Sequence, residues 1–248
     1  MPEQYPTLSK APITEALVDI RCKLPKGFNV DQFKTIGAKI SEDYPLEKTM
    51  RVHETKIDVK DAEQIVRTHE KINGYLYESS NRTKLVQLRL DGFTFNRLKP
   101  YNNWIEVRDE ALRLWNLYIE LVKPEVINRI ALRYINNLNV PMPVRDFRDY
   151  LTCPPEAPEG ETTGISGFFY RVVVATEDSR LTAIITQALE PKVDVENYLP
   201  IILDIDVIKF TTDGFLEEDI LAILEKLRDF KNQIFFSSIT KKLLEEYL

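Results

Sequence analysis

The sequence predicts an α+β protein in which long helices pack on an antiparallel sheet. Much of the chain divides into stretches where apolar and polar residues alternate, as in half-buried strands, while two longer stretches show helical spacing. The strands follow one another without the regular strand–helix alternation of a parallel sheet. With 248 residues, of which 44% are hydrophobic, the chain can bury a substantial core.

The first half, residues 1–124, predicts a strand, a helix, three strands and a long helix. Residues 15–24 alternate between apolar and polar side chains, and Asp31 can cap the helix that follows. Strands are expected at 50–59, 63–79 and 83–95. In residues 102–122 the apolar side chains recur at steps of three and four, which predicts an amphipathic helix that Pro124 ends.

The second half, residues 125–248, repeats this order and predicts two structurally related halves within one compact unit. We expect strands at 126–138, 168–175, 180–190 and 199–210, a short helix at 144–151 and a loop at 153–167. A C-terminal helix is expected from Glu217. The adjacent rings of Phe235 and Phe236 predict a break in it, after which Thr240 can cap a last short helix.

The composition bounds the partners and the compartment. A net charge of −6 and a sequence pI of about 5.2 argue against bulk binding to nucleic acid or to an anionic membrane. Only the first half is mildly basic, so a local basic surface is compatible with that half alone. Two distant cysteines, Cys22 and Cys153, favour a reducing compartment. The polar N-terminus and the lack of an apolar run of about 18 residues predict neither a signal peptide nor a membrane span, so we expect a cytoplasmic protein.

The familiar catalytic and cofactor motifs do not occur in this sequence. It has no Walker A loop, no dinucleotide-binding glycine motif, no nucleophile elbow and no HExxH or CxxC metal motif. The two histidines, His53 and His69, lack the spacing of a metal pair. No cofactor is therefore indicated, and a non-catalytic module that binds a ligand or another protein is the leading expectation.

Arginines at polar positions of the predicted strands suggest an anion-binding surface. A guanidinium group can bind a carboxylate or phosphate through two parallel hydrogen bonds and can stack on aromatic rings. The candidate ligand-binding residues are Arg97, Tyr101, Arg129, Arg133 and Tyr134. Their expected partner is an anionic small molecule or a protein. The alternative is that the strand arginines pair across the sheet with acidic residues, namely Asp19, Asp91, Asp204 and Asp206.

One carboxylate pair offers a different class of function. Asp204 and Asp206 lie two residues apart on a predicted strand, so both side chains leave the same face. Such a pair could hold Mg²⁺ beside a phosphate group. The alternative function is therefore a metal-assisted phosphoryl-transfer or hydrolytic enzyme that uses Asp204 and Asp206, and it would need a third oxygen ligand.

The break expected in the C-terminal helix suggests a protein contact. Successive residues of a helix differ by about 100° around its axis, so Phe235 and Phe236 cannot both face one core. A ring without cover inside the chain would be an apolar anchor, and a homo-oligomer formed through Phe235, Phe236 and Ile239 is the simplest arrangement to expect. In the alternative, both rings are buried under the following short helix.

Several phrases of the chain together resemble a sporadically distributed bacterial family of functionally uncharacterised proteins of about this length. The phrases are PITEA from Pro12 with DIR from Asp19, DGFTFNRLKPY from Asp91 with Trp104, LW from Leu114, RYIN from Arg133 with Arg129 before it, DID from Asp204, and LR, KN, FF and SIT from Leu227 onward. The resemblance implies a bacterial protein of one architecture from about residue 12 onward. It implies no reaction, ligand or catalytic residue.

Overall fold

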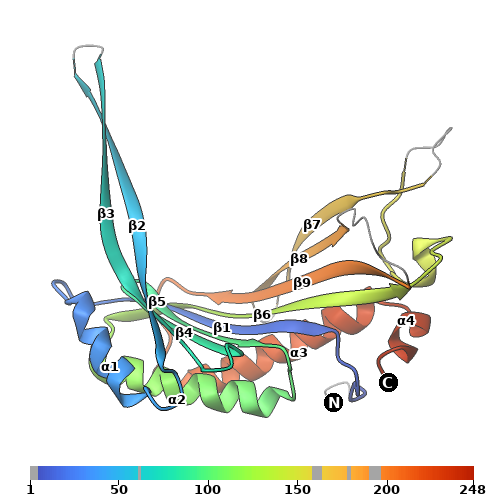
Figure 1. Ribbon diagram of the computed structural model, residues 1–248, viewed down its shortest axis with the longest axis horizontal. Coiled ribbons are helices and arrows are strands. Elements are labelled where there is room, and N and C mark those ends of the chain that lie inside the picture. The colour runs from blue at the N-terminus through green and yellow to red at the C-terminus, as the bar shows by residue number, and fades with distance from the viewer. Residues whose placement is uncertain (1–4, 61–62, 158–163, 178–179, 190–196) are drawn as a thin grey trace.

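The computed structural model describes residues 5–60, 63–157, 164–177, 180–189 and 197–248, and the side chains of 54–68 are not described. Figure 1 shows an antiparallel sheet with the long helices on one side. The strands are β1 (Ile13–Lys23), β2 (Leu46–Lys60), β3 (Glu63–Glu78), β4 (Lys84–Arg89), β5 (Gly92–Leu98), β6 (Val126–Pro141), β7 (Phe168–Ala175), β8 (Leu181–Leu189) and β9 (Tyr198–Phe210). The helices are α1 (Phe33–Lys39), α2 (Trp104–Val122), α3 (Ile220–Ser238) and α4 (Lys241–Glu245), with the 3₁₀ turns η1 (Val30–Gln32), η2 (Phe147–Asp149) and η3 (Glu217–Asp219). The predicted α+β class with an antiparallel sheet is confirmed.

The nine strands found in the described residues belong to one sheet in the order β2-β3-β4-β5-β1-β6-β9-β8-β7. The first strands of the two halves, β1 and β6, pair at its centre, with Val18 opposite Leu132. Helix α2 packs beneath β1 and β5, and α3 packs beneath β6 and β9. On the other side of the sheet, called here the open face, the β2–β3 hairpin projects away from the helices and β7 and β8 curve in the same direction (Figure 1).

Strict alternation along the strands separates the two sides of the sheet. Ala16, Val18 and Ile20 of β1 are fully buried against the helices, while Asp19 between them lies on the open face. The buried residues of both halves form one continuous core cluster. In the described part of the chain, no helix is both long and apolar enough to cross a lipid bilayer.

Helix α2 follows the predicted stripe closely. Asn103 caps it, because its side chain accepts a hydrogen bond from the Glu106 N–H at 2.9 Å. Trp115 is almost fully buried and packs against Phe93 and Tyr118. Because these contacts join the helix to the centre of the first half, α2 is a main source of core burial.

Four local predictions need correction. The stretch 83–95 forms two strands, because the chain turns at Leu90 and Asp91 and enters β5 at Gly92, whose φ of +145° is unfavourable for a side chain. Asn29 rather than Asp31 accepts the first capping bond before α1. The helix expected at 144–151 is only the turn η2. Helix α3 continues through Phe235 and Phe236 to Ser238, although Thr240 does cap α4 as predicted.

We predict that Trp115→Asp will unfold the protein at ambient temperature. The substitution removes a large buried ring and places a carboxylate in the core, for which a loss of at least about 3–5 kcal/mol of unfolding free energy is expected. The exposed neighbour gives a matched control, since Asn116→Asp on the same helix should change the stability by less than about 0.5 kcal/mol. Circular dichroism and thermal melting measure both, and a folded Trp115→Asp protein would contradict this role for α2.

Candidate functional site

The structure divides the five predicted ligand-binding residues between two sides of the sheet. Arg129 and Arg133 lie on the open face, because they alternate with core residues of β6. Tyr134 lies on the helix side, and its hydroxyl is 3.2 Å from that of Tyr101. Arg97 also lies on the helix side, where its Nη1 donates to Thr83 Oγ1 at 2.8 Å. These residues therefore do not form one site.

Asp19 is the centre of an ion-pair network on the open face. It is 6% exposed and accepts hydrogen bonds from four side chains: Arg21 Nε at 3.0 Å, Arg89 Nη2 at 2.9 Å, Thr94 Oγ1 at 2.7 Å and Arg129 Nη1 at 2.6 Å. Burial by itself would raise the pKa of Asp19, but the nearby guanidinium groups and the Thr94 hydroxyl outweigh it and hold the pKa below its ordinary value.

The proposed metal ligands belong to the same network. Arg133 donates to both oxygens of Asp204, from Nε at 2.8 Å and Nη2 at 2.5 Å. Arg129 Nη2 lies 3.6 Å from Asp206 Oδ2, and burial raises the pKa of Asp206 despite this cation. Within the described residues, no group of three or more His, Cys, Asp or Glu side chains is placed to hold a metal ion. The arrangement therefore favours ion pairing over metal ligation here.

On the helix side lies a cleft of about 990 Å³, called here the Lys231 cleft. Its walls are the N-terminal segment 5–13, the first turn of α2 and one face of α3. The N-terminal segment is fixed by backbone bonds, from Asn137 N–H to Pro12 O at 2.8 Å and from Lys10 N–H to Tyr247 O at 3.1 Å. The cleft therefore forms only in the folded chain, where the N-terminal segment lies beside the C-terminal helices.

Lys231 occupies an unusual position in this cleft. It is 8% exposed, its Nζ lies 4.1 Å from the centroid of the Tyr134 ring, and it donates a hydrogen bond to Asn232 Oδ1. Among the described residues, no carboxylate lies within ion-pair distance of Lys231. Burial, with a smaller contribution from the nearby Arg228 cation, lowers its pKa to about 7. The cleft therefore contains an amine that changes charge near neutral pH.

Two tyrosines and an asparagine give the floor of the cleft its polar groups. The hydroxyls of Tyr101 and Tyr134 contact each other, and burial raises the pKa of both groups, so both stay neutral at physiological pH. Asn136 follows on β6 and donates to Leu203 O at 2.9 Å. These groups can exchange hydrogen bonds with a ligand without adding a negative charge beside Lys231.

The acidic residues at the rim already have partners. Glu225 Oε1 accepts from Trp104 Nε1 at 2.9 Å and from Arg108 Nη1 at 3.1 Å. Arg228 lies farther from carboxylates, with Nη1 at 3.7 Å from Glu225 Oε2 and 3.9 Å from Asp229 Oδ1. Lys231 and Arg228 are therefore more available to a ligand than the carboxylate of Glu225 is.

The predicted interface residues Phe235, Phe236 and Ile239 lie at the end of α3. Phe235 and Ile239 are buried, and Phe236 is covered because the Tyr5 ring stacks on it with centroids 4.5 Å apart. The rings of Phe235 and Phe236 also pack edge to face. Phe235 and Ile239 are thus buried within the chain, Phe236 is partly buried, and the two rings form part of the cleft wall.

Lys231 and Asn232 were not among the predicted site residues. One signal could have identified Lys231, since it lies four residues after Leu227 on the apolar stripe of α3, where a charged side chain is unexpected. The closure of the cleft by the N-terminal segment has no comparable signal in the sequence.

Comparison with known proteins assigns no function to the open face or to the Lys231 cleft. No protein-family model matches this chain, and no curated protein matches it. The candidate site is therefore defined by geometry and charge alone.

We predict that Asp19→Asn will destabilise the fold in a pH-dependent way. The variant removes the buried carboxylate that Arg89 contacts at 2.9 Å and leaves this guanidinium with the more exposed Asp91 as its carboxylate partner, which should cost about 3–5 kcal/mol at neutral pH. Because the folded pKa of Asp19 is lowered, its contribution is complete above the unfolded pKa of about 3.9 and is lost as the pH falls through the folded value. Urea unfolding should therefore show a difference from wild type that shrinks below about pH 4.

A surface aspartate provides the control for this measurement. Asp109 pairs with Arg108 at the protein surface, so Asp109→Asn should cost less than about 1 kcal/mol. If Asp19→Asn is no more destabilising than Asp109→Asn at neutral pH, Asp19 is not the centre of the network.

Proposed function

We propose that this protein is a non-catalytic binding module that takes a small organic anion into the Lys231 cleft. The observation that carries the proposal is the buried amine of Lys231, which has no carboxylate partner among the described residues. An isolated buried ammonium group is costly, and the cost is relieved either by loss of its proton or by a bound anion. A ligand that brings a carboxylate or phosphate to Lys231 Nζ would supply the missing charge.

The surroundings support an anion with a ring or other flat apolar part. The cleft is large enough for a small metabolite, since ligand pockets commonly measure roughly 300–1,000 Å³. Aromatic side chains form much of its wall, among them Tyr101, Trp104 and Phe236. We infer that the anionic end contacts Lys231 and Arg228 while the flat part packs between these rings.

This proposal changes which predicted residues take part. Tyr101 and Tyr134 remain in the ligand-binding set. Arg129 and Arg133 are engaged by aspartates on the opposite side of the sheet, and Arg97 lies outside the cleft. The carboxylates of Asp204 and Asp206 are likewise engaged, so no observation favours the metal-dependent enzyme as a second function.

We also propose that the chain belongs to the family it resembles and that its two halves are structurally related. Residues of several phrases that carry the resemblance line the cleft, namely Pro12, Tyr101, Trp104, Tyr134, Asn136, Arg228, Lys231 and Asn232. For the duplication, the support is topological, because each half starts with a central strand, β1 or β6, returns beside it with β5 or β9, and then adds a 19-residue helix under the sheet. We further propose that the protein acts in the cytoplasm.

The anion proposal predicts a pH-dependent affinity that requires Lys231. With the pKa of Lys231 near 7, acetate and benzoate, which stay ionised throughout this range, should bind at least about tenfold more tightly at pH 6 than at pH 8.5, because the amine is mostly protonated only at the lower pH. Lys231→Met should abolish this binding, and benzoate should bind more tightly than acetate because its ring can pack on the aromatic wall. Calorimetric titration measures the affinities.

The charged and titratable groups around Lys231 define the control variants. Arg228, Glu225 and Asp229 line the same cleft, so a matched control must lie outside it. Lys226 is exposed on α3, so Lys226→Met removes the same charge without entering the cleft and should bind as wild type does. Equal affinities at the two pH values, or full binding by Lys231→Met, would contradict the proposal.

A further inference from the structure

The two edge strands of the sheet, β2 and β7, differ in how well they are protected against pairing with a strand of another chain. Strand β2, at one edge, is rich in charged residues and contains a register shift between Met50 and Arg51. Charges and irregular register are the features by which natural edge strands avoid pairing with other chains. Strand β7, at the other edge, has the sequence FFYRVVVA, which contains one charge and no proline.

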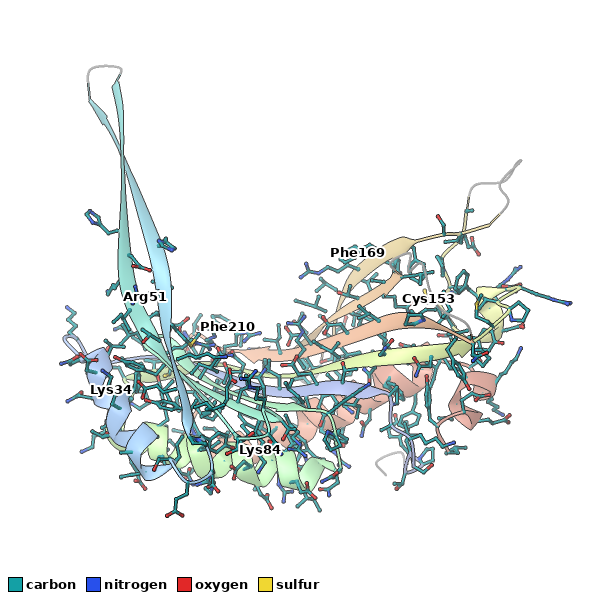
Figure 2. The ribbon with its side chains drawn as sticks, viewed as in Figure 1. Lys34, Arg51, Lys84, Cys153, Phe169 and Phe210 are labelled. Atoms are coloured by element: carbon teal, nitrogen blue, oxygen red, sulfur yellow. The ribbon has the colours of Figure 1, made fainter. Side chains whose placement is uncertain are left out.

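Strand β7 is also exposed on both of its faces. Phe169 is 72% exposed and Val173 is 62% exposed on the open face, while Tyr170 and Val174 are exposed on the side of the helices. Figure 2 shows Phe169 at the outer part of the sheet, on the side away from the helices. Within the described part of the chain β7 pairs only with β8. A strand of β-branched and aromatic residues with one open edge is suited to further strand pairing.

The hydrogen-bond phase of β7 identifies the free backbone groups. The Thr176 N–H donates to Leu181 O at 2.9 Å, so the backbone of Thr176 faces β8. Because backbone groups alternate along a strand, those of Phe169, Arg171, Val173 and Ala175 face away from β8. Each of these residues directs an N–H and a C=O to this edge, where no strand of the described residues pairs with them.

We propose that the occupant of this edge is a second copy of β7, paired antiparallel about a two-fold axis at Val172. This register joins every outward-facing residue to another, with Arg171 opposite Val173 and Phe169 opposite Ala175 of the second copy. The sheets of both copies then continue across the interface, and the exposed side chains of β7 gain apolar neighbours. This inference is independent of the anion site.

The neighbouring registers are less favourable for physical reasons. A two-fold axis at Arg171 would place two guanidinium groups directly opposite each other on the same face, which is destabilising. An axis at Val173 would leave the backbone groups of Phe169 without a partner. The axis at Val172 avoids both defects, so the pairing is specific and can be tested residue by residue.

Sedimentation of wild type and two Val173 variants tests the pairing. Wild type should sediment with twice the mass of one chain at high micromolar concentration. Val173→Pro removes an N–H that faces the free edge, where proline is tolerated within the sheet, so the variant should be a folded monomer. Val173→Thr keeps the N–H and the branched shape and should remain a dimer. A monomeric wild type, or a dimeric Val173→Pro protein, would overturn the proposal.

Disulfide trapping tests the register without depending on the proline variant. In a Cys153→Ser background, Val172→Cys places two cysteines opposite each other across the axis, at a Cα separation of roughly 4.5–5.5 Å that a disulfide can bridge. Val174→Cys places its two cysteines several residues out of register. Mild oxidation should give a cross-linked dimer with Val172→Cys alone. Equal trapping of both variants, or none with Val172→Cys, would rule out this register.

Discussion

The pairing of β1 with β6 at the centre of the sheet is the constraint on which the rest of the structure depends. It joins the two halves through a long antiparallel ladder, and it fixes which residues of each strand face the helices. Val18 and Leu132 are directed into the core together, and Asp19 and Arg129 are directed together to the open face. A slip of one residue would exchange these sets and bury the charges.

The same alternation gives the two sides of the sheet different chemistry. On the open face, Asp19 and Asp204 compensate the arginines that would otherwise attract an anion. On the helix side, Lys231 reaches the ring of Tyr134, whose neighbour Arg133 is an ion-paired residue of the other face. These arginines of the open face are thus paired with carboxylates, while the Lys231 amine in the cleft has no carboxylate partner among the described residues. This contrast is the reason for placing the proposed anion site in the cleft.

The sequence predicts elements better than it predicts neighbours. The α2 stripe around Trp115 depends only on local spacing, which explains why its boundaries agree with the structure. The Asp19 network depends on which strands pair, and the periodicity of the sequence does not specify that. The strand pattern does give ion pairing between strand arginines and Asp19 as an alternative. The cover over Phe236 comes from Tyr5, at the opposite end of the chain. Lys231 differs from these cases, because a charged side chain on the apolar stripe of a helix is a local signal that the sequence does contain.

The charge state of Lys231 is the most direct test of the account. Nuclear magnetic resonance of the lysine side-chain Cε and Nζ atoms, assigned with Lys231→Met, follows this one amine through a pH titration of the ligand-free protein. The account predicts a midpoint near pH 7, because burial disfavours the ammonium form. A midpoint near the ordinary lysine value of about 10.4 would show that the amine is solvated or already paired, and would contradict the account.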